Sequence, residues 1–302
     1  MTKLSRLLKY IQTRYIPAEI YSKIIFKKLM GYKLDLDNPK TLNEKLQWMK
    51  LRGPKFINPV MVDKYKVREH IKNLFSGKYL IPLIGVYNSH ESLPEPKKDD
   101  LPLIIKTNHD SGVGAIYRSL NDHDINNVKK IMRNRMLTNH YHSSKEYPYK
   151  NIRPYILVER LLLDKNGKIP NDYKFHYFNG ILEFIYCSID REGEDVRHIY
   201  CPDWKRQSFG WGKDESKFKN NSKDIAKPEN FDLMCEISKK IASDYPYVRV
   251  DLYNVDGNVF FGEMTFFQGS GFDRIFPYEK DLELGDKIIL ENLEKKNDFK
   301  YS

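Results

Sequence analysis

The chain has 302 residues, 40% of them hydrophobic, which is enough for one large or two modest domains with a buried core and excludes a disordered polymer. It has no apolar run of about 18 residues, so no transmembrane helix is predicted; its three scattered cysteines exclude a disulfide framework and fit a reducing cytoplasm. The net charge of +10 is concentrated in residues 1–34, which hold eight Lys and Arg side chains against one acid, Glu19.

Helices are predicted over most of residues 1–75, because apolar side chains recur there at helical spacing. A basic helical arm at the start of the chain can meet an anionic membrane surface or an acidic polymer, or it can be an ordinary solvated helix face. Nucleic acid is the least favoured partner, since no signature for it is present, and no signal peptide is expected because the N-terminus lacks a compact apolar core before a cleavage site. The signals for helix ends are Gly31 as a stop, Thr41 and Glu44 as a capping box, and Asp63 as the cap of a helix through Ile71.

From Tyr79 onward the pattern changes to short β-rich runs separated by polar loops. The sum predicts the α+β class, with a helical region at 1–75 and two strand-rich parts at 76–158 and 159–302. The predicted elements are strands near 79–87 and 101–108, a helix at about 122–137, a strand within 155–163, a hairpin over 172–190, loops over 190–230 and a helix over 231–245.

The segment 247–271 predicts a hairpin turned at an Asp-Gly pair. Strand residues alternate faces, so Arg249 and Asp251 share one face, as do Glu263 and Thr265. An odd loop or a bulge would place Asp251 opposite Glu263, whereas a strict two-residue turn would put the two acids on opposite faces. Two carboxylates and a hydroxyl beside an arginine suit Mg²⁺ and the phosphates that it bridges. An ordinary charged surface hairpin is the alternative.

The segment LIIKTNHDSGVGAIYRS places Lys106 near the end of an apolar strand, ahead of a small flexible loop and a returning strand. Glycines let backbone N–H groups approach a phosphate closely, and the lysine adds a positive charge. The loop, with Ser111, Gly112 and Gly114, matches neither a Walker A loop nor a dinucleotide fingerprint. Without further context, an ordinary Gly-rich hairpin tip is the alternative.

The order of these parts resembles the ATP-grasp superfamily over about residues 60–275. An Asp-Lys helix start, a strand lysine with a Gly-rich lid, a glutamate at a strand end and an arginine-acid hairpin follow one another. Nearly the whole chain also resembles the narrower TupA-like ATP-grasp group of surface-polysaccharide (teichuronopeptide-type) biosynthesis. The segments that carry this resemblance are NPKTLNEKLQWMKL, VDKYKVREHI, KTNHDSGVGA, DYKFHYFNG and RVDLYNVDGNVFFGEMTFFQGSGF.

The resemblance implies an ATP-grasp fold behind a helical N-terminal region, with ATP and Mg²⁺ as cofactors. The implied roles are ATP phosphate binding for Lys64 and Lys106, a mobile lid for Ser111, Gly112 and Gly114, adenine and ribose contacts for Glu159 and Asp172, phosphate or substrate contact for Lys174, stabilisation of the transferred phosphoryl group for Arg249, and Mg²⁺ ligation for Asp251, Glu263 and Thr265.

Two departures from the superfamily limit this transfer. Thr265 stands where the superfamily usually has Asn, although a hydroxyl can still ligate Mg²⁺. Residues 1–60 are too short for the usual N-terminal substrate domain, so the superfamily's substrate-binding residues cannot be carried over.

The resulting hypothesis is a cytoplasmic ATP-dependent carboxylate–amine ligase that works through an acyl phosphate in surface or capsular polysaccharide biosynthesis. It would join an amino acid or amine to a uronic-acid-type glycan, with peripheral contact at the inner membrane face. One alternative is a nucleotide-sugar-dependent glycosyltransferase with Asp35 and Asp37, or Asp251, on the metal. Another is a basic adaptor that binds acidic glycan without catalysis.

Weaker signals accompany these. His109 follows the strand lysine closely; it is expected either to bind an acceptor carboxylate or act as a base, or simply to order the lid. Alternating aromatic and basic residues in the 200–213 loop could stack and pair with sugars, but a tryptophan-pinned loop is favoured. His140 and His142 are expected to be ordinary surface histidines. Cys187, His198 and Cys201 do not have the spacing of a zinc site and lack a fourth ligand.

Overall fold

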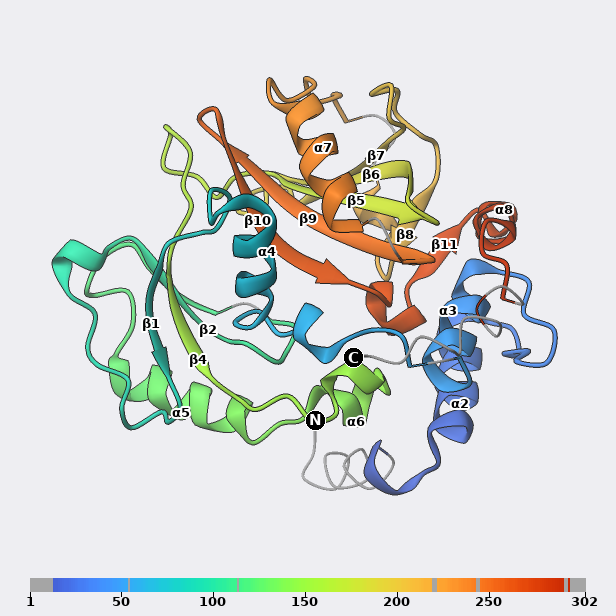
Figure 1. The fold of residues 1–302 in the computed structure, drawn as a ribbon, viewed down its shortest axis with the longest axis horizontal. Helices are drawn as coiled ribbons and strands as arrows, with labels where there is room; N and C mark the ends of the chain where they lie inside the picture. The colour runs from blue at the N-terminus through green and yellow to red at the C-terminus, as the bar shows by residue number, and fades with distance from the viewer. Residues whose placement is uncertain are drawn as a thin grey trace.

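The computed structural model describes residues 13–53, 55–112, 114–218, 222–242, 245–290 and Leu293. The helical pattern expected within residues 1–12 lies outside these residues, as does Val113 of the Gly-rich loop. The α+β class is confirmed (Figure 1). The α-helices are α2 (Ala18–Met30), α3 (Leu42–Leu51), α4 (Val67–Phe75), α5 (Ile125–Met136), α6 (His140–Ser144), α7 (Phe231–Ala242) and α8 (Tyr278–Asp286). The strands are β1 (Leu83–Tyr87), β2 (Leu103–Thr107), β3 (Ala115–Tyr117), β4 (Ile156–Arg160), β5 (Asp172–Phe178), β6 (Ile181–Ile189), β7 (Val196–Tyr200), β8 (Gly210–Gly212), β9 (Tyr247–Val255), β10 (Asn258–Thr265) and β11 (Arg274–Phe276).

Two of the predicted helix signals act as expected. The Thr41 hydroxyl accepts a hydrogen bond from the Glu44 backbone N–H at 3.1 Å, and the Glu44 carboxylate accepts one from the Thr41 N–H, also at 3.1 Å. This reciprocal pair is a capping box at the start of α3. Gly31 ends α2 with a φ of +86°, a left-handed conformation that a residue with a Cβ adopts only at a cost.

The strands form two larger antiparallel sheets and one small one. The four-stranded sheet has the order β1-β4-β2-β3, the five-stranded sheet the order β10-β9-β5-β6-β7, and β8 pairs with β11. Figure 1 shows the four-stranded sheet beside α5 and the five-stranded sheet beside α7, with α4 between the two sheets. We call these the first lobe and the second lobe.

Each lobe has its own hydrophobic core. The first lobe buries Ile105 and Val158 of its sheet against Met132 of α5. In the second lobe the core is larger and also takes in Leu46 of α3 and Ile71 of α4. The N-terminal helices thus pack onto the second lobe, while the division of the chain at 75 and 158 stays a prediction.

The hairpin of β9 and β10 combines a two-residue turn with a bulge. The strands pair directly from an Asp-Gly turn, and the register then shifts at one extra residue, Gly262. As a result Asp251 pairs with Glu263, and Arg249 pairs with Thr265. This confirms the register expected for a bulged hairpin; without the bulge the two acids would lie on opposite faces of the sheet.

Candidate active site

Arg249 on β9 connects the two acids of this hairpin, which we call the acid hairpin. Its Nε donates to Asp251 Oδ1 at 2.6 Å and its Nη2 to Asp251 Oδ2 at 2.7 Å. The same Nη2 donates to Glu263 Oε1 at 2.8 Å, and Nη1 donates to the side-chain oxygen of Gln268. Arg249 and Asp251 are 8% and 2% exposed, so the pairing compensates charges that have lost most of their water.

Lys174 on β5 extends this cluster across the sheet. It lies directly opposite Asp251 in the strand register, and its Nζ donates to Asp251 Oδ2 at 3.0 Å and to Asp172. Burial raises the pKa of Asp251, and the positive charges of Arg249 and Lys174 oppose that rise. Asp172 Oδ1 is buried and has no hydrogen-bond partner among the described residues. The structure therefore brings Asp172, Lys174 and Asp251 together, as the resemblance implied.

The Glu263 carboxylate lies close to several positively charged side chains. Burial raises its pKa, but nearby cations outweigh this effect and hold the pKa at about 2. Its side chain nevertheless stays 36% exposed, so a ligand can reach it. The cations that act on it, in order of strength, are Lys64, Arg249, Lys174 and Lys106. Lys64 and Arg249 contact Glu263 directly, and Lys106 of the first lobe lies within electrostatic range of it.

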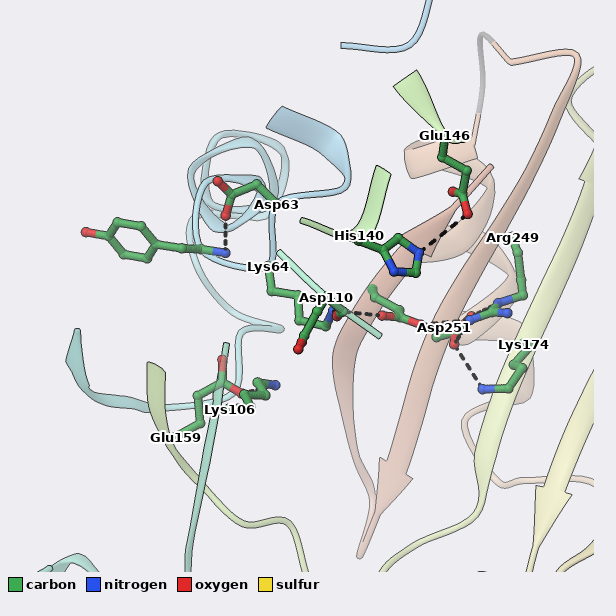
Figure 2. Close-up of polar contacts among 12 residues, drawn as sticks. Asp63, Lys64, Lys106, Asp110, His140, Glu146, Glu159, Lys174, Arg249 and Asp251 are labelled. Carbon is green, nitrogen blue, oxygen red and sulfur yellow. Dashed lines mark hydrogen bonds and ion pairs between the residues drawn. The ribbon is translucent and has the colours of Figure 1, made fainter. Parts of the chain in front are cut away.

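In the first lobe, Lys106 is paired with Glu159 on the neighbouring strand β4. The Lys106 Nζ lies 2.5 Å from Glu159 Oε2 (Figure 2). Arg68 Nη1 lies 3.3 Å from Glu159 Oε1. Glu159 is only 3% exposed, so its side chain is committed to these two cations. The adenine contact that the resemblance implies for Glu159 stays a prediction, because its side chain is occupied by these two cations. Arg68 was missed, although it stands one helical turn after Lys64.

Lys64 lies between the two lobes. Its Nζ donates to the backbone oxygen of Asp110 at the tip of the β2–β3 hairpin, and it lies 3.7 Å from Glu263 Oε2. The Asp110 carboxylate is held in turn by Arg135 of α5, with Nε 2.9 Å from Oδ2. Arg135 is a second residue that no sequence signal pointed to. The lid tip is therefore tied both to α5 and to the acid hairpin.

The loop predicted to be a lid connects β2 and β3, and its role over a nucleotide stays a prediction. Ser111 and Gly112 are exposed, and Arg135 lies so close to Gly112 that a Cβ there would be 1.8 Å from its Nη2. At Gly114 a Cβ would lie 2.3 Å from the backbone oxygen of Ile105, which leaves no room for a side chain. Gly114 thus lets β3 return directly along β2.

Asp63 fixes the position of Lys64. Its Oδ1 accepts hydrogen bonds from the backbone N–H groups of Tyr65 and Lys66, at 2.9 and 3.2 Å, and from Asn108 Nδ2 at 2.9 Å. Asp63 therefore caps the turn before α4 instead of the first residue of α4, because the chain makes an extra turn there. The Lys64 N–H also donates to the Asn108 carbonyl at 3.0 Å, which joins this turn to the base of the lid.

His109 lies at the base of the lid and is only 4% exposed. Its Nε2 is 3.1 Å from the Thr138 carbonyl oxygen, and its Nδ1 is 3.3 Å from Asn108 Oδ1. Burial lowers its pKa. Because the ring is buried and both of its nitrogens face oxygens of the protein itself, the contacts favour the alternative in which His109 orders the lid over the one in which it acts as a base.

The Asp35 and Asp37 pair has a structural explanation. Asp35 Oδ1 accepts hydrogen bonds from the backbone N–H groups of Asp37 and Asn38, both at 2.9 Å, and Asp37 Oδ1 lies 2.6 Å from Arg52 Nη1. This is an Asx turn. Thr265, the third predicted metal ligand, is half-buried on β10 beside the acid hairpin's charges.

The tryptophans of the 200–213 loop are structural. Trp211 is fully buried and donates from Nε1 to the Asp273 carbonyl oxygen at 3.1 Å. Trp204 stacks on Tyr200 with ring centroids 4.5 Å apart. His198 and the cysteines form no metal site, since the described part of the chain has no group of three His, Cys, Asp or Glu side chains that could hold a metal.

A cavity of about 540 Å³ opens beside the charged cluster. It is lined by Tyr65, Lys66, Glu69 and Leu80, among others, and meets the cluster at Arg68. Of the side chains in the ion pairs described above, only Arg68 lines this cavity, so the cavity does not enclose the acid hairpin.

Solved structures with some likeness to this chain include D-alanine–D-alanine ligases. The enzyme from Bacillus anthracis, complexed with ATP, is 13% identical, with a TM-score of 0.39 over 68% of this chain and 54% of that one. The Helicobacter pylori enzyme is 16% identical, with a TM-score of 0.41 over 76% and 62%. An ADP complex of N5-carboxyaminoimidazole ribonucleotide synthetase is 11% identical, with a TM-score of 0.41 over 68% and 45%. The chain spans about half the length of the first and third of these proteins. Because the identities and TM-scores are this low, no residue role is transferred from these structures.

No curated protein matches this chain significantly. Within the described residues, no helix has the length and apolar character needed to span a membrane. The family model described as TupA-like ATPgrasp matches residues 44–289, which include every residue of the charged cluster. The chain belongs to the TupA-like ATP-grasp family, whose cofactors are ATP and Mg²⁺.

Proposed function

We propose that this chain is an ATP- and Mg²⁺-dependent carboxylate–amine ligase that acts through an acyl phosphate. Its place is surface or capsular polysaccharide biosynthesis, where it joins an amino acid or amine to a uronic-acid-type glycan through an amide bond. The observation that supports this most is that Lys64, Arg249 and Lys174 pair with the acids of the hairpin: Lys64 lies 3.7 Å and Arg249 2.8 Å from Glu263, and Lys174 lies 3.0 Å from Asp251. The polysaccharide context rests on the family resemblance.

The proposed chemistry explains why so many cations are needed. Forming an amide from a carboxylate is uphill in water, so a carboxylate oxygen attacks the γ-phosphorus of ATP and ADP leaves. An amine then displaces phosphate from the acyl phosphate. Lys64 and Lys106 would bind the triphosphate, and Arg249 would stabilise the charge on the phosphoryl group in transit. Closure of the lid loop over the site would exclude water.

Asp251 and Glu263 fit the Mg²⁺ that accompanies ATP. Mg²⁺ is usually held by one or two carboxylates together with substrate phosphates, and these two carboxylates lie directly opposite each other on the acid hairpin. When bound, the ion would neutralise phosphate charge. Arg249 and Lys174 hold the two acids in place.

Peripheral contact with the inner face of the cytoplasmic membrane is part of the proposal, and α2 supports it. Ile20 and Ile24 are 52% and 55% exposed although they are apolar, and they alternate with exposed Lys23 and Lys27. Such a helix face suits an anionic lipid surface. Ile20→Ser/Ile24→Ser should reduce co-sedimentation with phosphatidylglycerol vesicles, while Ile131→Ser on α5 should not. Equal sedimentation of wild type and the α2 variant would remove this part.

The ligase activity can be tested before the amine is known. The protein is incubated with ATP, Mg²⁺, hydroxylamine and single members of a panel of uronic acids and amino acids. An acyl phosphate reacts with hydroxylamine, so one panel member should give a hydroxamate together with ADP. Absence of hydroxamate from every carboxylate, with tight binding of a UDP-sugar and none of ATP, would instead favour the glycosyltransferase.

A further inference from the structure

The loop that follows the acid hairpin is strained. Three consecutive residues, Gly269, Ser270 and Gly271, have φ values of +53°, +60° and +69°. Ser270 carries a Cβ and enters this region only at a cost, so neighbouring groups must hold it there. They do: its carbonyl oxygen accepts hydrogen bonds from Lys50 Nζ at 2.7 Å and from Gln47 Nε2 at 3.0 Å.

This strained conformation aims the Ser270 hydroxyl at Glu146. The hydroxyl donates to Glu146 Oε1 at 2.7 Å, and His140 Nε2 lies 3.6 Å from the same oxygen. Glu146 is 5% exposed and belongs to the segment between α6 and β4, far from Ser270 in the sequence. His140 was expected to be an ordinary surface histidine. That expectation is wrong, because its side chain is only 18% exposed and contacts this buried carboxylate.

The Glu146 carboxylate has no ion pair with a lysine among the described residues. The charge of Glu146 acts on Lys50, but Lys50 Nζ donates to the Ser270 carbonyl oxygen at 2.7 Å. Lys145 Nζ donates to the Thr13 carbonyl oxygen at 2.5 Å. A buried carboxylate held by one hydroxyl and one imidazole is an acceptor for a further cation.

Tyr149 joins this carboxylate to the phosphoryl-transfer region. Its ring packs edge-on against His140 with centroids 4.8 Å apart. Burial raises the pKa of its hydroxyl well above the ordinary value, and the negative charges of Glu146 and Glu263 raise it further, while Arg249 opposes them. One hydroxyl thus lies within electrostatic range of both clusters. Figure 2 shows the contact between His140 and Glu146. The hairpin loop links the two clusters directly, because Gln268 accepts from Arg249 and Ser270 donates to Glu146.

We propose that Glu146 binds the amine nucleophile of the ligation and accepts its proton, with Ser270 and His140 as positioning residues. The inference rests on the proposed function, because it needs an acyl phosphate at the neighbouring centre. The ligand class is a primary amine that arrives as an ammonium ion, which a carboxylate recognises by charge and hydrogen bonding.

Each proton and electron pair in this step has a donor and an acceptor. The ammonium group gives one proton to the Glu146 carboxylate and becomes an amine. Its nitrogen lone pair attacks the acyl carbon, so that a C–N bond forms while the bond between the acyl carbon and the phosphate oxygen breaks. The electron pair of the broken bond leaves with phosphate, which takes the second proton of the nitrogen. Glu146 returns its proton to water as the amide departs.

The test separates activation from ligation in wild type and Glu146→Gln. Activation is read as hydroxamate formed at saturating hydroxylamine, with the carboxylate that scores for wild type. Ligation is read as phosphate release stimulated by ethanolamine, L-lysine and other primary amines at low millimolar concentration. The glutamine amide oxygen can still accept the Ser270 hydrogen bond, so the fold should survive. We expect hydroxamate formation within threefold of wild type and a loss of ligation of about 100-fold or more.

Two further variants guard against a purely structural effect. Glu146→Asp, which keeps the charge, should recover part of the ligation rate. His140→Gln should alter the pH profile of ligation, whereas His142→Gln on the same helix should leave it unchanged. Equal ligation rates in wild type and Glu146→Gln, or equal losses of hydroxamate and ligation, would overturn the inference alone. No hydroxamate from wild type with any carboxylate would overturn the proposed function, and this inference with it.

Discussion

The acid hairpin and the lid carry charges of the same kinds but hold them in different ways. On the hairpin, Arg249 and Asp251 are nearly fully buried, and strand register alone aligns them with Glu263. On the lid, Asp110 lies at a loop tip next to exposed residues, and it is held by Arg135 from a separate helix. In the proposed reaction, the hairpin is the preorganised half of the site. The lid is the half that can open when the contacts that hold it are broken.

This difference suits the order of events in the proposed reaction. A metal and phosphoryl centre gains most from dipoles and charges that need not reorganise, while a nucleotide can enter only if part of the site opens. Because Lys64 contacts both the lid tip and Glu263, it is the residue through which lid position and hairpin charge are coupled.

The largest expected effect comes from breaking the hairpin half. Glu263→Gln removes a candidate metal ligand and the acid on which the four cations act, so ATP turnover should fall by about 10³-fold. Asp251→Asn should be similarly inactive and in addition destabilised by about 3–5 kcal/mol, because Arg249 loses its buried partner. Asp256→Asn, in the exposed turn of the same hairpin, is the control. Turnover is measured as steady-state ADP release, and a wild-type rate in Glu263→Gln would contradict the account.

Breaking the lid half at Lys106 should have a smaller effect. Lys106→Ala removes one of two lysines assigned to the triphosphate, so the Kd for MgATP should rise by about 10–100-fold. Lys97→Ala, an exposed lysine of the loop before β2, should bind MgATP as wild type does. Calorimetric titration measures both; identical affinities for all three proteins would exclude a role of Lys106 in nucleotide binding.

The close approach at Gly114 sharpens the comparison further. In Gly114→Val a side chain would collide with the Ile105 carbonyl oxygen, so β3 should separate from β2 and the lid should lose its order. We expect protease cleavage near residue 112 to become faster by roughly tenfold and no longer to be slowed by MgATP, with a change in global stability below about 2 kcal/mol. Ser111→Ala provides the control. Unchanged cleavage would mean that the hairpin does not depend on this contact.

The smallest effect concerns the support behind the hairpin loop. Burial lowers the pKa of Lys50 to about 7, so between about pH 7 and pH 10 the unfolded chain binds more protons than the folded one. Stability contributed through Lys50 therefore rises with pH in this window and is lost as the pH falls to 7. Lys50→Met should remove a rise of about 2 kcal/mol between pH 7 and 9, measured by urea unfolding. Lys40→Met, at an exposed lysine, is the control and should keep the wild-type dependence of stability on pH. If the free energy of unfolding rose equally with pH in wild type and Lys50→Met, this prediction would be refuted.

The parts of the site that lie on regular elements could be predicted from sequence. Strand alternation predicted that Arg249 and Asp251 share one face, and that Glu263 and Thr265 share one face. Whether the two pairs lie on the same side depended on the bulge at Gly262, and this had to be left open because an extra residue in a strand has no reliable sequence signal. A capping box likewise located the start of α3, since its two residues are three apart in the chain.

Contacts between distant segments could not be predicted. Arg135 reaches Asp110 from the next helix, and Ser270 reaches Glu146 across 124 residues. Neither pairing leaves a pattern in the sequence, because the first depends on how α5 packs against its sheet and the second on how segments 124 residues apart pack together. His140 was misjudged because its polar neighbours suggested an exposed position, whereas tertiary packing leaves it half-buried against Glu146.

The most direct test of the shared site is a double-mutant cycle between its two halves. The Kd for MgATP is measured for wild type, Lys106→Ala, Glu263→Gln and the double variant. If both lobes grip one nucleotide, the effects are not additive, and a coupling of about 1 kcal/mol or more is expected. Effects that add to within about 0.3 kcal/mol would show that the two halves act independently, and would contradict the account.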